Sequence, residues 1–284
     1  MKIHNDAEGM TLALAWAEKG LYTTSPNPHI GCVLVRDGEV IGAGVTQAVG
    51  GDHAEIQALK DAQARGNGEA VRGATAYVTL EPCSHHGRTP PCADALVRAG
   101  IGRVVAAMED PNPLVAGQGM ALLAAAGIAT SSGLLAEQAY ELNIGFFSRM
   151  TRGRPWVRMK TAASLDGMTA LHNGASQWIT GERARADGHA WRARACAILT
   201  GIGTVKADDP QLNVRGIDTP RQPIRIVIDS RLEIDPAAKI LQGGGTWIVA
   251  AVRDPEKGAA LRALGNEVIL LPNASGKVDL PELM

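Results

Sequence analysis

The sequence predicts an α/β protein of two domains, and three observations support this. Strand-like apolar runs alternate with stretches of helical spacing along the chain, which is the pattern of sheets covered by helices. The length of 284 residues exceeds the roughly 100–200 residues of a typical domain. A polar, basic segment with Gly and Pro at 151–155 interrupts the alternation. We place the boundary there, between domains at residues 1–150 and 151–284.

The first domain is predicted to be an α/β/α sandwich. Residues 8–19 carry apolar side chains at helical spacing, and Gly20 ends this helix. The same spacing predicts helices at 52–62, 93–99, 120–126 and 135–147, and apolar runs predict strands at 30–35, 40–45, 76–80, 103–108 and 128–130. A polar Asp-Gly turn joins the first two strands, which predicts a β-hairpin. We expect the second helix to bury Ile56, Leu59 and Ala62.

A candidate zinc site is spread over two segments of this domain. His53 and Glu55 open the second predicted helix, Pro82 and Cys83 follow a strand, and Cys92 precedes the third helix. A His-x-Glu followed by Pro-Cys and a second Cys is typical of zinc-dependent nucleobase deaminases. One imidazole and two thiolates cancel the charge of Zn²⁺ and leave a fourth position open for an activated water. The pattern therefore predicts His53, Cys83 and Cys92 as metal ligands.

Glu55 is the candidate catalytic residue. Hydrolytic deamination needs a group that moves protons from water to the ring nitrogen and the departing ammonia, and a carboxylate two residues from a metal ligand lies within reach of both. The alternative is a structural zinc site, in which His85 or His86 would be the fourth protein ligand. That alternative leaves Glu55 without a role, so we favour the catalytic site.

The spacing of the cysteines distinguishes between families of zinc-dependent deaminases. Eight residues, Ser-His-His-Gly-Arg-Thr-Pro-Pro, separate Cys83 from Cys92. This spacer resembles the deaminase domain of the bifunctional deaminase/reductases of riboflavin biosynthesis, as do Pro26-Asn27-Pro28 and Asp110-Pro111-Asn112-Pro113. The resemblance implies a cytidine-deaminase-like domain that deaminates 2,5-diamino-6-(5-phosphoribosylamino)pyrimidin-4-one. It makes Asn27 a substrate-contact candidate, with a simple turn asparagine as the alternative.

The second domain shows a coarser α/β pattern. Gly201 and Gly203 alone are a weak nucleotide-binding signal, because Lys206 occupies the place of the third glycine. Residues 156–167, 176–180, 201–215 and 226–230 together resemble the reductase half of the same family. This resemblance implies a dihydrofolate-reductase-like fold in which NADPH reduces the ribosyl group to a ribityl chain. It implies that Ala162, Trp178, Thr204, Asp208 and Ser230 bind NADPH and that Ser176, Arg192, Leu212 and Arg215 bind the substrate.

The resembled proteins continue beyond the point where this sequence ends. A strand is predicted at 266–271, and a helix begins near Pro281, shortly before Met284. The resemblance therefore implies an incomplete reductase domain with a free sheet edge that another chain can pair with. We expect a homo-oligomer, and the alternative of a non-catalytic assembly module in the second half stays open.

Composition argues against partners other than a small molecule. The net charge is −1, the isoelectric point is about 6.7, and aromatic residues make up 4% of the chain. Nucleic-acid binding proteins need a basic surface and often stacking aromatics, so a tRNA-type deaminase is disfavoured. No apolar run reaches the roughly 18–20 residues of a membrane span. Four cysteines, two of them assigned to metal, do not suggest a disulfide scaffold. We expect a soluble cytoplasmic enzyme.

Overall fold

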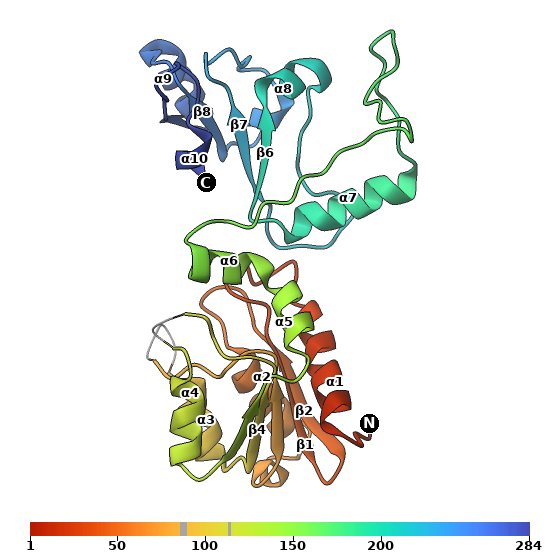
Figure 1. Cartoon of the computed structure of the whole chain (residues 1–284), viewed down its shortest axis with the longest axis vertical. Coiled ribbons are helices and arrows are strands. Elements are labelled where there is room, and N and C mark those ends of the chain that lie inside the picture. The colour runs from red at the N-terminus through yellow and green to blue at the C-terminus, as the bar shows by residue number, and fades with distance from the viewer. Residues whose placement is uncertain (86–89, 113–114) are drawn as a thin grey trace. The chain divides into compact units, whose positions relative to one another are not determined.

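The computed structural model describes residues 1–85, 90–112 and 115–284. Its contacts divide the chain into two compact units, Met1–Val157 and Arg158–Met284 (Figure 1). The boundary predicted after residue 150 falls inside helix α6 (Ile144–Arg152), so the first unit continues to the end of this helix and a few residues beyond it. Each unit has its own sheet and its own buried core.

The first unit is built on a five-stranded sheet of order β2-β1-β3-β4-β5 (Figure 1). Its strands are β1 (Gly31–Arg36), β2 (Glu39–Val45), β3 (Thr75–Val78), β4 (Arg103–Ala106) and β5 (Ala129–Ser132). β1 pairs antiparallel with β2 and β3, whereas β3, β4 and β5 run parallel. The hairpin is confirmed. Its Asp37 and Gly38 have φ of 51° and 75°, the left-handed conformation that a tight hairpin turn requires.

Helices cover both faces of this sheet. They are α1 (Asp6–Glu18), α2 (Ala54–Ala64), η1 (Glu69–Val71), α3 (Cys92–Ala99), α4 (Gln118–Ala125), α5 (Ala136–Leu142) and α6. Successive side chains of a strand point to opposite faces. Accordingly Cys32 and Leu34 of β1 pack with α2, α3 and α4, while Val33 and Val35 pack with α1 and α5. The α/β/α sandwich is confirmed, and Gly100 ends α3 in the left-handed conformation.

Two glycines of β2 determine how α2 lies on the sheet. A Cβ atom on Gly42 would come within 2.5 Å of the Ala58 carbonyl oxygen, and one on Gly44 within 2.4 Å of the Ala54 carbonyl oxygen. Only the alanine side of the helix fits against such a close strand. The predicted buried face was therefore partly wrong: Ala54, Glu55, Ala58 and Ala62 are buried, but Ile56 and Leu59 are only partly buried. This rotation carries Glu55 into the interior.

The predicted single helix at 135–147 was also wrong. It is two helices, α5 and α6, which meet at Asn143. The Asn143 backbone has φ −118° and ψ 20°, which lies outside the helical region. Its side chain is buried, with 3% of the residue exposed, and its hydrogen bonds are made with a distant loop, as described below.

The second unit contains a parallel four-stranded sheet of order β6-β7-β8-β9 (Figure 1). Its strands are β6 (Ala197–Gly201), β7 (Ile224–Ile228), β8 (Thr246–Ala250) and β9 (Glu267–Leu270), and its helices are α7 (Glu182–Arg194), α8 (Ile202–Asp208), η2 (Lys239–Leu241), α9 (Pro255–Ala263) and α10 (Leu280–Leu283). Val205 of α8 and Leu261 of α9 join Val227 and Ile248 in the main core. The crossovers therefore lie over one face of the sheet.

The segment between α6 and α7 has no helix or strand. Its large apolar side chains, including Met159, Leu165, Met168 and Trp178, are exposed. Within the part of the chain that the structure describes, no helix has both the length and the apolar character that crossing a membrane requires.

Candidate metal centre and substrate sites

The three predicted metal ligands come together. The nearest ligand atoms of His53, Cys83 and Cys92 all lie within 4.8 Å of one another. His53 Nδ1 is 3.5 Å from Cys83 Sγ and 3.3 Å from Cys92 Sγ. Tetrahedral zinc, with bonds of about 2.3 Å to sulfur and 2.0–2.1 Å to nitrogen, holds neighbouring ligand atoms roughly 3.5–3.8 Å apart. The donor set and its spacing therefore fit Zn²⁺.

Two helix starts and one strand end position these ligands. His53 is the N-cap of α2, Cys92 is the first residue of α3, and Cys83 follows β3 by a few residues. The Cys92 backbone N–H donates to Cys83 Sγ at 3.3 Å. Hydrogen bonds from Cys92 and His53 lower the pKa of Cys83 well below that of a free thiol despite its partial burial. The site is therefore suited to hold a thiolate, the form that binds metal.

Glu55 lies beside this cluster in the interior. Only 2% of the residue is exposed, and no hydrogen-bond partner is found for its Oε2 among the described residues. Burial, together with the charge of Cys83, raises its pKa to about 7. A buried carboxyl oxygen without a partner is costly for stability, and beside the metal ligands it is a candidate proton acceptor. These features are compatible with the catalytic role predicted for Glu55 from the sequence.

The alternative structural zinc site finds no support in the described residues. His85 is exposed, and the group of possible ligands consists of His53, Cys83 and Cys92 alone. His86 lies outside the described residues, as do residues 87–89.

Sequence reasoning gave no role to Glu81, the buried residue two positions before Cys83. Its Oε1 accepts hydrogen bonds from the backbone N–H of Gly119 at 2.7 Å and Met120 at 3.2 Å. Its Oε2 accepts from Gly117 at 2.9 Å and Asp110 at 3.1 Å. The carboxylate therefore joins the cysteine loop to the start of α4 and to the loop after β4. A glutamate directly after a buried strand and before a proline is the only sequence signal of this role.

The loop that carries Asn27 lies at the same edge of the sheet as the metal ligands. Gly31 at the start of β1 exchanges hydrogen bonds with Thr79, just past the end of β3. Asn27 is half-buried, and its N–H donates to the Thr24 carbonyl at 3.0 Å. The buried Thr24 hydroxyl contacts the Asn27 carbonyl and His29 Nδ1. Asn27 is therefore placed by a hydrogen-bonded loop, and it also fits the turn role that was its alternative.

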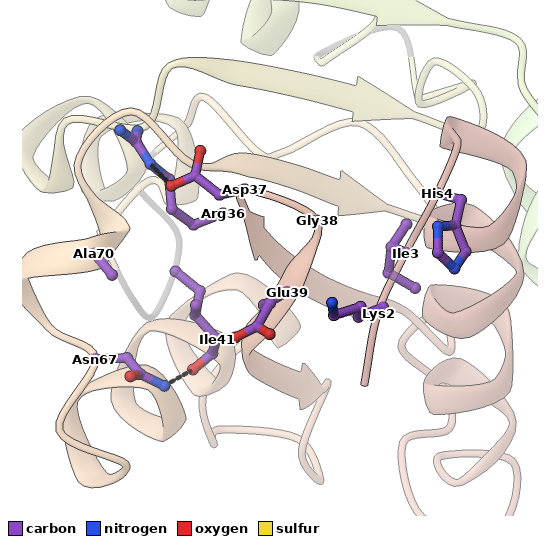
Figure 2. Close-up of a pocket in the computed structure, with 10 residues that line it drawn as sticks. All are labelled: Lys2, Ile3, His4, Arg36, Asp37, Gly38, Glu39, Ile41, Asn67 and Ala70. Carbon is purple, nitrogen blue, oxygen red and sulfur yellow. Dashed lines mark hydrogen bonds and ion pairs between the residues drawn. The ribbon is translucent and has the colours of Figure 1, made fainter.

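A shallow pocket of about 510 Å³ lies elsewhere (Figure 2). It surrounds the β1–β2 turn, with Lys2, Arg36, Asp37 and Glu39 among its lining residues. Arg36 is at the end of β1 that lies beside the start of β3. Cys83 follows the other end of β3, so this pocket is at the opposite edge of the sheet from the metal ligands.

In the second unit, three of the five predicted NADPH residues lie at one sheet edge. Thr204 and Asp208 are exposed on α8, which directly follows β6, and Ser230 follows β7. Because β6 and β7 are parallel neighbours, these residues share the carboxyl edge, where ligands bind in open α/β sheets. Ala162 and Trp178 lie in the irregular segment before α7. No hydrogen bond, ion pair or ring contact among the described residues joins them to the other three; Trp178 packs under the Arg185 guanidinium.

Two of the four predicted substrate residues share one partner. The Arg215 backbone N–H donates to His189 Nδ1 at 3.1 Å, and Arg192 Nη1 lies 3.5 Å from the same nitrogen. Leu212 packs partly buried against the core, with φ of 49°. Ser176 is in the irregular segment. No role was predicted for His189, although its position one helical turn before Arg192 was a signal.

Comparisons with known proteins agree with the division of the chain into two units. Residues 3–108 match the cytidine and deoxycytidylate deaminase zinc-binding region, and residues 155–284 match the RibD C-terminal domain. The chain is 49% identical over 289 residues to riboflavin biosynthesis protein RibD of Escherichia coli K12, covering 97% of this chain and 76% of that protein. The chain belongs to the RibD family. RibD of Aquifex aeolicus is 44% identical, with 98% of this chain and 77% of that protein covered.

Solved RibD structures have the same fold. One form of Acinetobacter baumannii RibD superposes with a TM-score of 0.86 at 46% identity, covering 95% of this chain and 74% of that one. The Thermotoga maritima protein, a diaminohydroxyphosphoribosylaminopyrimidine deaminase and 5-amino-6-(5-phosphoribosylamino)uracil reductase, gives 0.82 at 35% identity, covering 93% and 74%. The predicted family and fold class are confirmed. The protein is a riboflavin-biosynthesis enzyme with a zinc-dependent deaminase part and an NADPH-dependent reductase part.

Proposed function

We propose that the first unit deaminates 2,5-diamino-6-(5-phosphoribosylamino)pyrimidin-4-one with His53, Cys83 and Cys92 as zinc ligands. The observation that carries this proposal is the pairing of a zinc-compatible donor set with the buried, unpartnered oxygen of Glu55. Bound zinc supplies the activation of a water molecule near neutral pH. The net reaction replaces the ring C–NH₂ by C=O, consumes one water and releases one ammonia.

Glu55 moves the protons in this reaction. Its carboxyl group is buried beside the metal ligands, and a positioned carboxylate of this kind both accepts and returns a proton during the reaction. It takes a proton from the attacking water and delivers protons to the ring nitrogen and the leaving amino group. Burial keeps bulk water away from Glu55, so the proton it accepts is returned to the substrate.

The variant Glu55→Gln tests this role. The amide has nearly the same shape but cannot accept the proton, so turnover should fall by about 10³-fold or more while zinc content stays stoichiometric. Glu18→Gln, on the exposed end of α1, is the matched control and should deaminate at the normal rate. Normal turnover in Glu55→Gln would remove this residue from the mechanism.

For the second unit we propose that Ala162, Trp178, Thr204, Asp208 and Ser230 bind NADPH and that Ser176, Arg192, Leu212 and Arg215 bind the sugar-phosphate. NADPH supplies a hydride to the ribosyl carbon, and the chain supplies binding and orientation. Two observations support these assignments: Thr204, Asp208 and Ser230 share one sheet edge, and Arg192 and Arg215 both contact His189. Asn27 is the proposed contact of the deaminase unit with the pyrimidine.

Mass spectrometry of the substrate after incubation with zinc-loaded protein and NADPH separates the activities. A gain of about one mass unit indicates deamination alone, and a gain of about three indicates deamination followed by reduction. Titration with NADPH, followed by its fluorescence, distinguishes a working reductase from a non-catalytic assembly module. Absence of NADPH binding in folded protein would favour the assembly module.

We further propose that the protein is a homo-oligomer that works in the cytoplasm on a small molecule, without nucleic acid or membrane. The sheet edge at β6 supports association, since Leu199 is exposed there and an edge strand offers unpaired backbone groups. The reducing cytoplasm keeps Cys83 and Cys92 available for metal. Light scattering after size-exclusion chromatography measures the oligomeric state, and a monomer at micromolar concentration would contradict the proposed homo-oligomer.

A further inference from the structure

Three basic side chains converge at one place in the second unit. His189 and Arg192 lie one turn apart on α7, and Arg215 approaches from the loop after α8. Among the described residues, no ion pair joins Arg192 or Arg215 to a carboxylate. Burial and the charge of Arg215 lower the pKa of Arg192. A half-buried guanidinium beside another cation is costly for stability unless an anion balances it, so the cluster is suited to bind an anion.

The imidazole of His189 is neutral in this arrangement. Its Nδ1 accepts a hydrogen bond from the Arg215 N–H and faces the Nη1 donor of Arg192. An accepting nitrogen carries no proton, so the hydrogen-bond pattern assigns the proton of the ring to Nε2. Partial burial and the charges of Arg192 and Arg215 lower the pKa of His189, which agrees with the neutral form. A charged side chain at this position would repel both arginines.

The Arg215 guanidinium has N–H groups that are available to a ligand. Arg215 Nη1 donates to the neutral oxygens of Gln211 and Asn213. Both acceptors are uncharged and take up one nitrogen of the guanidinium. Among the described residues no acceptor is found for its other N–H groups, which leaves them for a ligand. A planar guanidinium suits the oxygens of a phosphate monoester.

We infer that His189 is a positioning residue for the phosphate group of the substrate. As a neutral acceptor it fixes the Arg215 backbone N–H. Because it carries no charge, it also lets Arg192 Nη1 lie 3.5 Å from the same nitrogen, so that both arginines are held close together before the ligand arrives. The inference rests on the proposed assignment of Arg192 and Arg215 to the sugar-phosphate, and it adds the residue that holds them in place. Fixing long side chains in advance lowers the entropic cost of binding.

Substitutions at His189 separate the acceptor from the bulk of the ring. In His189→Asn the amide oxygen lies close to the place of Nδ1 and retains the acceptor, whereas His189→Ala removes it. We expect the Kd for ribose 5-phosphate, measured by calorimetry at low ionic strength, to rise about tenfold in His189→Ala and to stay within about threefold of the wild type in His189→Asn. Circular dichroism checks that both variants fold.

Two further measurements keep the inference distinct from the proposed function. Nitrogen-15 NMR of the histidine ring should show the proton of His189 on Nε2, and a proton on Nδ1 would overturn the inference. Arg215→Ala should lose ribose 5-phosphate binding. Wild-type binding in Arg215→Ala would refute the substrate assignment itself. If Arg215→Ala loses ribose 5-phosphate binding but His189→Ala binds like the wild type, only the role of His189 is refuted. The same holds if His189→Asn and His189→Ala weaken binding equally.

Discussion

Asn143 holds the backbone of His29 through both the oxygen and the nitrogen of its side-chain amide. The His29 N–H donates to Asn143 Oδ1 at 2.6 Å, and Asn143 Nδ2 donates to the His29 carbonyl at 3.0 Å. The amide thus pairs with the chain as a neighbouring strand would, across 114 positions of sequence. The break between α5 and α6 presents this side chain, and the loop that it fixes carries Asn27.

We predict that Asn143→Asp weakens substrate binding more than catalysis. Aspartate keeps the acceptor for the His29 N–H but places an oxygen against the His29 carbonyl, so the loop loses one anchor. The KM for deamination should rise about tenfold while kcat changes less than about threefold. Steady-state kinetics on zinc-loaded protein measures both values.

Asn67→Asp is the matched control for this experiment. Asn67 Nδ2 donates to the Ile41 carbonyl at 3.1 Å, at the sheet edge away from the metal ligands (Figure 2). The control loses a similar side-chain-to-backbone hydrogen bond, so it should cost stability without a change in KM. Equal KM values in the two variants would mean that Asn143 contributes to folding only.

Glu81 should prove essential for the shape of the deaminase site. In Glu81→Gln an NH₂ group replaces one carboxylate oxygen and faces two backbone N–H donors, so two buried hydrogen bonds are lost. We expect a loss of about 3 kcal/mol in stability and about tenfold or more in zinc affinity. Thermal unfolding and competition with a chelator measure these effects. The control Glu69→Gln, at an exposed glutamate of the same unit, should change neither stability nor zinc affinity. Unchanged zinc affinity in Glu81→Gln would mean that Glu81 only holds the start of α4 and does not shape the metal site.

Zinc should stabilise the first unit as well as serve catalysis. Metal at 100 times its Kd stabilises a folded protein by about 2.7 kcal/mol. Removal with a chelator should therefore lower the Tm by several degrees and abolish deamination. In Cys92→Ser, added zinc should neither raise the Tm nor support deamination. Cys196→Ser, at an exposed cysteine, should behave as wild type. Stoichiometric zinc in purified Cys92→Ser would contradict the assigned ligand set.

Local patterns predicted much of the fold and the residue types of the metal site, because helical spacing, the Asp-Gly turn and the His-x-Glu motif act over few residues. The contacts that were missed join distant segments. Asn143 lies in a stretch of helical spacing, and asparagine disfavours a helix only weakly, so nothing local indicates the break. The buried face of α2 depends on Gly42 and Gly44, which belong to another element. Glu81 binds backbone groups, which carry no sequence signal.

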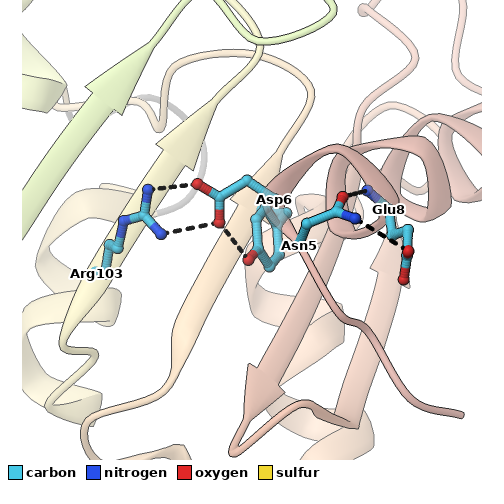
Figure 3. A network of polar contacts seen from close by, with 5 residues as sticks. Asn5, Asp6, Glu8 and Arg103 are labelled. Carbon is cyan, nitrogen blue, oxygen red and sulfur yellow. Dashed lines mark hydrogen bonds and ion pairs between the residues drawn. The ribbon is translucent and has the colours of Figure 1, made fainter.

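Asp6 joins α1 to the central strands through a charged network (Figure 3). Its two carboxylate oxygens accept from Arg103 Nη1 at 2.9 Å and Nη2 at 2.6 Å, and the Tyr77 hydroxyl donates to it at 2.8 Å. The Arg103 hydrogen bonds lower the pKa of Asp6 below its ordinary value. A group whose pKa is lowered on folding contributes stability above its unfolded pKa, and this contribution is lost as the pH falls through the folded pKa.

Asp6→Asn should therefore destabilise the first unit in a pH-dependent way. Both partners are more than a third exposed, so solvent screening limits the loss to about 1 kcal/mol at pH 7. The difference from wild type should shrink between pH 7 and pH 3, because the contribution is lost as the pH falls from the ordinary pKa of an aspartate, about 4, toward the lowered pKa of folded Asp6. Hydrogen exchange of peptides from α1 and β4 at both pH values measures the opening free energy. The control Asp37→Asn removes an exposed partner of Arg36 and should change stability by less than about 0.5 kcal/mol. An equal loss in Asp6→Asn at pH 7 and pH 3 would show that the charge of Asp6 is not the cause.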